Sequence, residues 1–469
     1  MAQKGKSMYI KKVTINNIRS ISDFEMTFPE PAGWHVVIGD NGAGKSTVVK
    51  SIALALLDIT DINAAGQDWD EWLKNDGTLT GSTELMITPF ESNQTIQNRI
   101  TFEKEFVFGE NSYSVELDKD VEIVAAYAMI REVIFRGKKT FDSALLITTA
   151  FSHPVPTPTI RAEEAKQKRE YWFSAGYGPF RRFTGGSQDK EKIYKTNPNL
   201  GSHLSVFGED VALPEALNFL RDLYIEELEA NKRLNESRVK TKPKSTLENL
   251  IKFINEAHLL PHGAVIDAVG LKEVYFKDGY GNTVSSLQMS DGYRSILSMT
   301  FELIRQLIRV YGNQLVFENI NNGKNIIDLP GVVLIDEIDA HLHPTWQTRI
   351  GEWFTKYFPK IQFIVTTHSP LVCRACEKGS IWRLASPGSD TESGEVKGLE
   401  RERLIFGNIL DAYGTELFGQ SPVRSEKTDE KQKRLGQLNM LSAFGKITEE
   451  EEKERLKLQQ TLSTNAPIN

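Results

Sequence analysis

The order of apolar and polar residues near the start of the chain predicts a short series of secondary-structure elements. Residues 9–28 alternate between apolar and polar positions, which predicts two strands, and the compact apolar run 34–38 is typical of a buried strand. In residues 47–57 the apolar positions recur at helical spacing. The segment therefore predicts a strand, a glycine-rich turn and a helix, which is the context of a phosphate-binding loop.

Two apolar runs later in the chain predict further buried strands. Residues 332–335 and 362–367 are short and apolar, and each is followed by polar residues, while residues 296–308 have the spacing of a helix. Between residues 60 and 286 short strand-like pieces and two helical segments are separated by proline-rich and charged turns. We interpret this middle part as an insertion.

Composition and charge narrow the class of protein. Of the 469 residues 40% are hydrophobic and 25% charged, which excludes a chain that is disordered throughout, collagenous or rich in disulfides. The net charge of −7 gives no global basic field, so any polyanion must be bound locally. Two cysteines, no apolar export signal and no apolar run long enough to span a membrane predict a cytoplasmic protein with no membrane contact.

A complete phosphate-binding motif stands between the first buried strand and its helix. Residues 39–46 read Gly-Asp-Asn-Gly-Ala-Gly-Lys-Ser and satisfy the pattern G-x-x-x-x-G-K-[ST]. The glycines let backbone N–H groups turn towards phosphates, Lys45 reaches the β and γ oxygens, and the Ser46 hydroxyl faces Mg²⁺. The predicted ATP-binding residues of this loop are Gly39, Asp40, Asn41, Gly42, Ala43, Gly44, Lys45, Ser46 and Thr47.

Polar residues at the ends of the two later strands supply the remaining chemistry. We expect Asp336 to hold Mg²⁺ and Glu337 to act as the general base that polarises the attacking water. Because the ends of parallel strands meet at one edge of a sheet, His368 can face the same nucleotide and sense its γ-phosphate. Plainer interpretations stay open, since an acidic pair can be a helix N-cap and a lone histidine a structural group.

The order of these motifs resembles that of ATP-binding-cassette (ABC) ATPases, especially the branch with the SMC and RecF proteins. Ser290, Asp291 and Gly292 precede a predicted helix at the place of the family's signature motif. The resemblance implies a homodimer or higher oligomer in which two heads close on two ATP molecules, with the signature of one head touching the γ-phosphate held by Lys45 of the other. Residues 15–20 resemble the family's first strand and turn, which would place Arg19 near the nucleotide.

The resemblance also implies a fold class and a division of the chain. We expect an α/β fold, an ABC-type P-loop ATPase head whose mixed sheet is flanked by helices, with a helical insertion and a C-terminal helical tail. The expected parts are an N-terminal lobe at 1–155, an inserted helical or irregular region at 156–286, a C-terminal lobe at 287–385 and an extension for partner or oligomer contact at 386–469.

The chain departs from the transporter branch of that family at several positions. Asp291 stands where transporters usually carry glycine, and Tyr293 where they carry glutamine. His343 occupies the place of the D-loop aspartate, whose dimer contact Asp339 could take over in part. Gln167 is one candidate for the Q-loop glutamine. A transporter subunit is therefore disfavoured.

The form Asp-Glu-Ile-Asp-Ala-His-Leu-His-Pro at 336–344 resembles stand-alone ATPases of bacterial phage-defence modules, which include the overcoming-lysogenization-defect enzymes. Residues 172–182 and 207–210 are similar to segments of the Septu (PtuA) and retron-linked ATPases, although the aromatic residues there could equally be core packing. This resemblance implies that the ATPase regulates an HNH nuclease of the PtuB kind. After Pro370 the sequence has no histidine and no D-x-D pair that follows a strand, so we expect the nuclease to be a partner.

Three other features have alternative interpretations. A RecF-like DNA-repair clamp would use basic residues at 161–182 and 232–244 for nucleic-acid contact, although such runs are more often solvated surface. Cys373 and Cys376 form a C-x-x-C pair, but zinc requires about four ligands, so we expect buried free thiols. His341 and His343 are expected to shape the loop after the catalytic strand.

Overall fold

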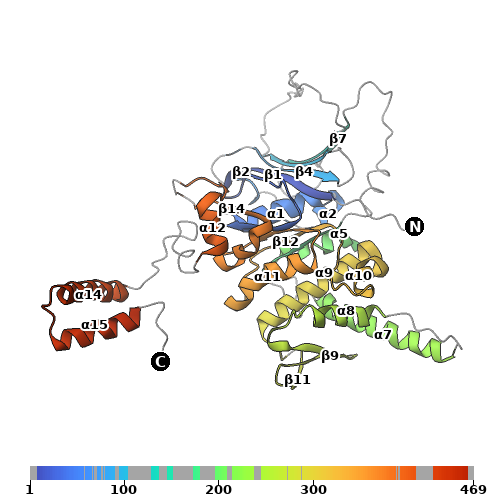
Figure 1. The fold of residues 1–469 in the computed structure, drawn as a ribbon. Coiled ribbons are helices and arrows are strands. Elements are labelled where there is room, and N and C mark those ends of the chain that lie inside the picture. Colours follow the sequence, from blue (N-terminus) through green and yellow to red (C-terminus); the bar gives the residue numbers. More distant parts are fainter. Residues whose placement is uncertain are drawn as a thin grey trace, which may run out of the picture. The chain divides into compact units, whose positions relative to one another are not determined.

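In the computed structural model, helices pack around two six-stranded sheets, and a third sheet has three strands (Figure 1). The residues described are 8–57, 59–65, 67, 71–74, 78, 80–89, 95–103, 128–136, 145–150, 173–179, 196–208, 214–236, 245–271, 273–286, 288–386, 388, 391–407 and 426–462.

The first sheet carries the phosphate-binding loop and has the strand order β15-β14-β3-β13-β12-β8. The four pairings from β14 to β8 are parallel, whereas β15 pairs with β14 antiparallel, so the sheet is mixed. Every residue of its three central strands is buried, as expected where helices cover both faces of a parallel sheet. The bounds are β3 Gly33–Ile38, β8 Ser174–Tyr177, β12 Gly331–Ile335, β13 Ile361–Thr366, β14 Gly379–Arg383 and β15 Gly394–Glu395.

The second sheet has the order β2-β1-β4-β5-β6-β7 and is antiparallel except where β5 pairs with β6. Helix α1 (Lys45–Leu56) packs against strands of both sheets, and ten of its residues are buried. The main apolar core is the layer in which α1, β1, β2 and the first sheet meet. The bounds are β1 Met8–Ile18, β2 Ile21–Thr27, β4 Thr80–Pro89, β5 Thr95–Glu103, β6 Ala128–Arg136 and β7 Leu145–Ala150.

Helices α7, α8, α9 and α11 lie on the other side of the first sheet, together with a small third sheet of order β11-β10-β9 (Figure 1). Helix α8 begins at a capping box, in which Ser245 and Glu248 satisfy each other's backbone N–H groups. The bounds are α7 Pro214–Glu236, α8 Thr246–Glu256, α9 Asp291–Val316, α10 Glu318–Asn321, α11 Pro344–Tyr357, β9 Val265–Val269, β10 Val274–Lys277 and β11 Thr283–Ser285. Shorter elements are α2 Ile59–Ala64, α5 Pro198–Gly201, α6 Leu204–Phe207, η3 Pro261–Gly263, η4 Pro370–Lys378 and α12 Gly398–Phe406.

The contacts divide the chain into two compact units, Met1–Gly407 and Asn408–Asn469. The second unit contains the helices α14 (Glu426–Ala443) and α15 (Glu449–Leu462), which pack on each other and are joined by an ion pair between Arg434 and Glu454 at 2.8 Å. In the part of the chain that the structure describes, no helix has the length and apolar character needed to cross a bilayer.

The expected α/β class, with a mixed sheet flanked by helices, is confirmed. The predicted strands and helices around the motifs are present, within a few residues of the expected bounds. The part expected as an insertion, 156–286, also supplies β8 to the first sheet and β9, β10 and β11 to the third, which the apolar pattern did not predict. The expected boundaries at 155, 286 and 385 stay predictions.

Candidate functional site

The loop at 39–46 has the backbone conformation that its glycines permit. Buried strand β3 leads into Gly39, and Gly42 and Gly44 have φ values of 79° and 103°, in the left-handed region that favours glycine. A Cβ on Gly44 would lie 2.7 Å from Ser20 Oγ and 2.9 Å from Ile21 Cγ1. The turn between β1 and β2 therefore presses against the loop just before α1 begins at Lys45.

Lys45 is 6% exposed and folds back over its own loop. Its Nζ donates to the backbone oxygens of Gly39 at 2.8 Å and Asp40 at 2.9 Å. Burial lowers the pKa of Lys45, while four carboxylates act in the opposite direction. In order of their effect, these are Glu337, Asp336, Asp339 and Asp40. The ammonium thus sits among carboxylates, with hydrogen bonds that an incoming phosphate could replace.

Asp336 and Glu337 directly follow strand β12 and are held together by one threonine. Thr366 Oγ1 donates to Asp336 Oδ1 at 2.6 Å and accepts from the Glu337 backbone N–H at 2.8 Å. Asp336 is 2% exposed, whereas Glu337 is only partly buried. Glu337 has φ 47°, a left-handed conformation that costs a non-glycine residue of order 1 kcal/mol and is concentrated at functional sites.

Asp339 connects the end of β12 to the end of β13. Its Oδ1 accepts from Thr367 Oγ1 at 2.5 Å and from the His368 backbone N–H at 3.3 Å. From the resemblance, Asp339 was expected to take over in part a contact across a dimer, which stays a prediction, and this contact within the chain was not predicted. The two threonines before His368 were the available signal, because buried hydroxyls at a strand end need polar partners.

His368 completes the group at this edge of the sheet. Its Nδ1 lies 3.5 Å from Lys45 Nζ, and since an ammonium only donates, this arrangement suits a neutral imidazole with an unprotonated Nδ1. Burial lowers the pKa of His368, and the positive charge of Lys45 lowers it further. The structure therefore brings Lys45, Asp336, Glu337 and His368 together, as the motif order predicts.

The residues present fit a magnesium ion bound with a nucleotide. Mg²⁺ prefers oxygen ligands and is usually held by one or two carboxylates together with phosphate oxygens and water. Asp336 supplies a buried carboxylate, and Ser46 supplies a partly buried hydroxyl in the first turn of α1. The other carboxylates around Lys45 add the negative charge that favours a dication.

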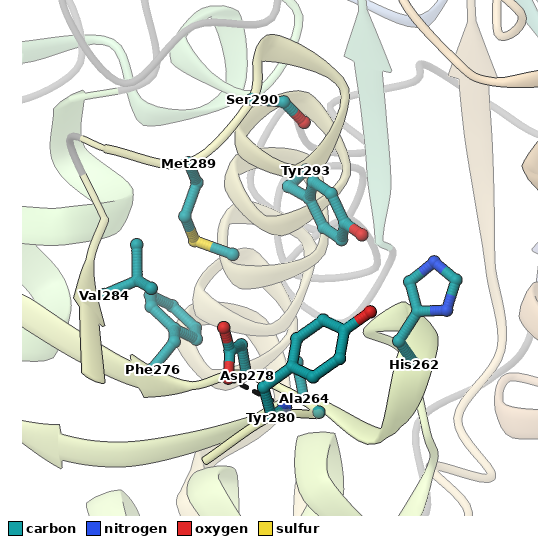
Figure 2. A pocket seen from close by; sticks show the side chains of 10 residues that line it. His262, Ala264, Phe276, Asp278, Tyr280, Val284, Met289, Ser290 and Tyr293 are labelled. Carbon is teal, nitrogen blue, oxygen red and sulfur yellow. Dashed lines mark hydrogen bonds between the residues drawn. The ribbon is translucent and has the colours of Figure 1, made fainter. Parts of the chain in front are cut away.

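The predicted signature residues lie at the start of α9. Ser290 is the N-cap of this helix, and its side chain makes no capping hydrogen bond. A Cβ on Gly292 would lie 2.6 Å from the backbone oxygen of His341, so the helix start touches the loop that follows the carboxylates. His341 itself has φ 65°. Ser290 also lines a pocket formed with the third sheet (Figure 2).

Arg19 lies beside the phosphate-binding loop, but its described contacts are with Trp72. The guanidinium carbon is 5.1 Å from the centre of the Trp72 ring, and the Arg19 backbone N–H donates to the Trp72 oxygen at 2.9 Å. Burial lowers the pKa of Arg19, which the charge of Glu71 partly offsets. A contact of Arg19 with nucleotide stays a prediction.

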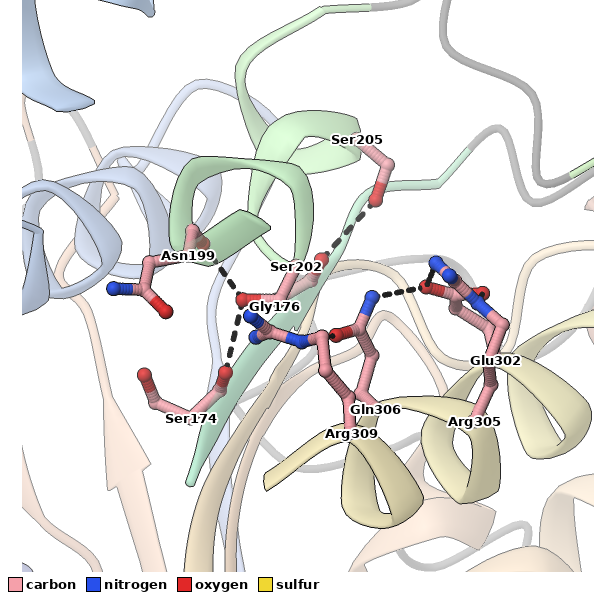
Figure 3. Close-up of polar contacts among 9 residues, drawn as sticks. All are labelled: Ser174, Gly176, Asn199, Ser202, Ser205, Glu302, Arg305, Gln306 and Arg309. Carbon is pink, nitrogen blue, oxygen red and sulfur yellow. Dashed lines mark hydrogen bonds and ion pairs between the residues drawn. The ribbon is translucent and has the colours of Figure 1, made fainter. Parts of the chain in front are cut away.

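Strand β8 forms the edge of the first sheet beside β12 and is covered by serines that the sequence analysis did not single out (Figure 3). Ser202 Oγ donates to the Ser174 oxygen at 3.0 Å, and Ser205 Oγ donates to the Gly176 oxygen at 3.1 Å. At the other side of β8, the Asp336 backbone N–H donates to the Tyr177 oxygen at 2.8 Å. These bonds fix the edge of the sheet next to Asp336 and Glu337.

Helix α9, which begins at the predicted signature residues, carries a series of buried, hydrogen-bonded polar side chains near β8 (Figure 3). Glu302 is 1% exposed and accepts from Arg305 at 2.7 Å and from Gln306 Nε2 at 2.6 Å. Arg309 Nε in turn donates to Gln306 Oε1 at 2.8 Å. A buried carboxylate requires such partners. The spacing of apolar residues in the sequence predicted the helix but not these polar contacts.

Several remaining predictions can be placed. Cys373 and Cys376 are free, buried thiols whose pKa burial raises, and no group of three or more potential metal-binding side chains occurs among the described residues. His343 caps α11, where its Nδ1 accepts from the Thr345 backbone N–H at 3.3 Å. Outside the described residues lie Gln167, residues 161–172 and 180–182 of the predicted aromatic and basic segment, residues 209–210 and the basic run 237–244.

The sequence of the chain is similar to those of several known proteins. The chain is 26% identical to the Septu protein PtuA of Bacillus mycoides over 94% of its own length and 52% of that protein. It is 23% identical to a protein named "Retron Vc95 probable ATPase" from Vibrio cholerae, over 77% of this chain and 71% of that one. A "Retron Ec83 probable ATPase" from Escherichia coli is 43% identical over 102 residues, 22% of this chain and 17% of that one. The chain thus spans about half the length of the Septu relative.

Solved structures were also compared. The recombination mediator protein RecF gives a TM-score of 0.38 at 11% identity, over 84% of this chain and 100% of that one. An Smc head bound to the C-terminal winged-helix domain of ScpA gives 0.41 at 13% identity, over 84% of this chain and 98% of that one.

A family assignment follows from the sequence match across the described site. Residues 35–374 match one protein family, and this range runs from the strand before the phosphate-binding loop to the segment after His368. The matched part is well over half of the chain. The chain belongs to the family described as "AAA domain, putative AbiEii toxin, Type IV TA system".

Proposed function

We propose that this chain hydrolyses ATP as an ABC-type ATPase of a Septu-like antiviral defence system. The observation that carries the proposal is the meeting of Lys45, Asp336, Glu337 and His368 at the carboxyl ends of β3, β12 and β13. Ligands of open α/β sheets bind at this edge, outside the ends of the strands. The relatives named as ATPases support the same reaction.

The roles of the residues follow from their contacts. Lys45 exchanges the Gly39 and Asp40 oxygens for the β- and γ-phosphates, and the loop N–H groups bind the rest of the phosphate chain. Glu337 positions and deprotonates the attacking water, with its backbone fixed by Thr366. Neutral His368 lies close enough to Lys45 to contact the γ-phosphate. Magnesium held by Ser46 and Asp336 would neutralise charge that develops on the phosphate oxygens.

Closure of two heads is the second part of the proposal. Ser290 and Gly292 of one head meet the γ-phosphate bound by Lys45 of the other, so that ATP joins the heads and hydrolysis releases them. The Ser290 side chain makes no capping hydrogen bond, so its hydroxyl, together with the backbone N–H groups at the start of the long helix α9, is suited to bind a phosphate oxygen. The contact between Gly292 and His341 links this surface to the loop after the carboxylates of the same head.

The third part concerns the partner. We infer that the nucleotide state of the heads regulates an HNH nuclease of the PtuB kind, and the similarity to Septu PtuA supports this inference. Two measurements test the proposal. Phosphate release from ATP by the purified chain tests hydrolysis, and co-purification of the chain with a PtuB-like HNH protein, with and without ATP, tests the partner. No ATP-dependent phosphate release would contradict the first part, and no stable complex in either state would contradict the third.

A further inference from the structure

A pocket of about 420 Å³ lies between the third sheet and the start of the signature helix. This volume is in the range of small-ligand sites. Its aromatic residues come from both sides: Phe276 and Tyr280 from the β10–β11 hairpin, and Tyr293 from α9. Figure 2 shows the Tyr280 and Tyr293 hydroxyls on the side of the pocket where His262 lies. The remaining lining residues are His262, Ala264, Asp278, Gly279, Val284, Met289 and Ser290.

The hairpin that forms one wall is held close to the turn at His262, which precedes β9. A Cβ on Gly279 would lie 2.1 Å from the His262 backbone oxygen, so only glycine permits this approach. Phe276 is 2% exposed and forms the floor. The pocket is therefore part of the packed fold of this region.

The charge of the lining selects the class of ligand. Asp278 is the only acidic residue among the ten that line the pocket, and none of the ten is a lysine or an arginine. The Asp278 carboxylate accepts from the Asn282 backbone N–H at 2.8 Å, from Asn282 Nδ2 at 3.1 Å and from the Tyr280 backbone N–H at 2.9 Å, and these bonds lower its pKa. A lining with one carboxylate and no lysine or arginine disfavours a phosphate and favours a cation.

The aromatic rings strengthen this preference. A lysine or arginine near the face of an aromatic ring is attracted by the ring quadrupole. Tyr280 is 94% exposed, so this side chain has almost no packing role within the chain. A large aromatic ring with so much free surface, next to a carboxylate, can attract a basic side chain from another molecule through both its ring face and the neighbouring charge.

We propose that this pocket receives a lysine or arginine side chain from a second copy of the chain when two heads close on ATP. The choice of a second copy rests on the proposed function, because Ser290 lines the pocket and is the residue that closure brings to the opposite head. The pocket would thus add to the interface between the two heads a contact that does not involve a phosphate group.

The first test measures cation binding by a single chain without nucleotide. The chain has eight methionines, and Met289 lines the pocket, so its ¹³C-methyl resonance is a local reporter once Met289→Leu has assigned it. The probe is Nα-acetyl-arginine amide, and the control probe is the citrulline analogue, which has the same shape without the charge. We expect the Met289 methyl to shift with the arginine probe only. Equal shifts with both probes, stronger shifts with adenosine monophosphate, or no shift would overturn the cation assignment.

The second test asks whether the side chain that enters the pocket comes from a second copy of the chain. In the Glu337→Gln background, which should hold ATP, the association constant of the chain is measured by sedimentation with ATP. Asp278→Asn and Tyr280→Ala should each weaken association about fivefold, the size expected of one cation–π or charge contact. Tyr275→Ala is the matched control, since Tyr275 is also exposed on β10 but does not line the pocket.

The outcomes separate this inference from the proposed function. Unchanged association of the Asp278→Asn and Tyr280→Ala variants would overturn the second copy as the occupant. If the Glu337→Gln chain does not associate with ATP at all, head closure is contradicted, and with it the assignment of the occupant. The arginine probe would in that case still decide whether the pocket binds a cation.

Discussion

The Nζ atom of Lys45 lies 3.5 Å from the Nδ1 atom of His368, although 323 positions separate the two residues in the sequence. The contact joins the start of α1 to the end of β13, which is paired with the phosphate-binding strand β3. The arrangement suits a neutral imidazole, in agreement with the lowered pKa of His368. In the proposed function this pair of side chains marks the position of the γ-phosphate.

Replacing Lys45 should abolish nucleotide turnover. In Lys45→Met the charge that neutralises the β- and γ-phosphates is lost, and we expect hydrolysis to fall by roughly two orders of magnitude or more. Steady-state phosphate release measures this. Lys397→Met is the control, because the Lys397 side chain is 74% exposed and should be dispensable. Turnover of Lys45→Met close to that of the control would show that the loop does not bind the reacting phosphates.

Glu337→Gln should separate binding from chemistry. Loss of a general base typically costs about 10²- to 10⁴-fold in rate, while the amide keeps the shape of the side chain and removes negative charge near ATP. We expect ATP affinity to be retained and single-turnover hydrolysis to be lost. Glu352→Gln, on the exposed side of α11, is the matched control. Normal hydrolysis by Glu337→Gln would remove the general-base assignment.

Gly292→Ala should disturb the signature surface. The added methyl group would lie 2.6 Å from the His341 oxygen, a backbone atom that can move only if the loop after Glu337 moves. We expect reduced ATP-dependent association, with thermal unfolding shifted by less than a core substitution would cause. Gly394→Ala provides the comparison, since a Cβ there meets nothing within 4 Å. Equal behaviour of the two variants would indicate that Gly292 is not confined in solution.

Acid should destabilise the fold partly through His35. Burial lowers the pKa of His35 to about 4, and its ring nitrogens are bonded to Ser380 Oγ and the Pro31 oxygen, each at 2.8 Å. Between pH 6.5 and 4 the unfolded chain binds a proton that the folded chain does not, so stability falls as pH falls, by up to about 1.4 kcal/mol per pH unit. Urea unfolding across this range should show a weaker pH dependence for His35→Gln than for the unsubstituted chain. Identical pH dependence would contradict a neutral His35 in the fold.

Elements that depend on one contiguous stretch of residues were predicted from the sequence. Elements that depend on pairing with residues far away in the chain were not. Residues 39–46 and the apolar strand before them are contiguous, so pattern and motif together predicted the loop around Lys45. Strand β8 has four residues and is recognisable only from its pairing with β12. A short strand at a sheet edge has no periodicity of its own to detect.

The same distinction applies within the site. Asp336, Glu337 and His368 follow recognisable strands, and their meeting was expected because those strands are parallel. The hydrogen bond that Asp339 accepts from Thr367 was not expected, since it depends on how Thr367 is oriented at the end of another strand. The pocket beside Ser290 depends on the third sheet, which supplies Phe276 from β10 and Val284 from β11 to its lining.

The central claim is that one ATP site is built from the loop of one head and the signature of another. A mixture of two inactive chains tests it most directly, namely Lys45→Met and Ser290→Arg. A mixed pair has one site with both defects and one site with neither, so we predict that each chain alone is inactive and that mixing them restores phosphate release to about a quarter of the unsubstituted rate, as random pairing implies. No recovery on mixing, with both chains folded and able to associate, would contradict the account.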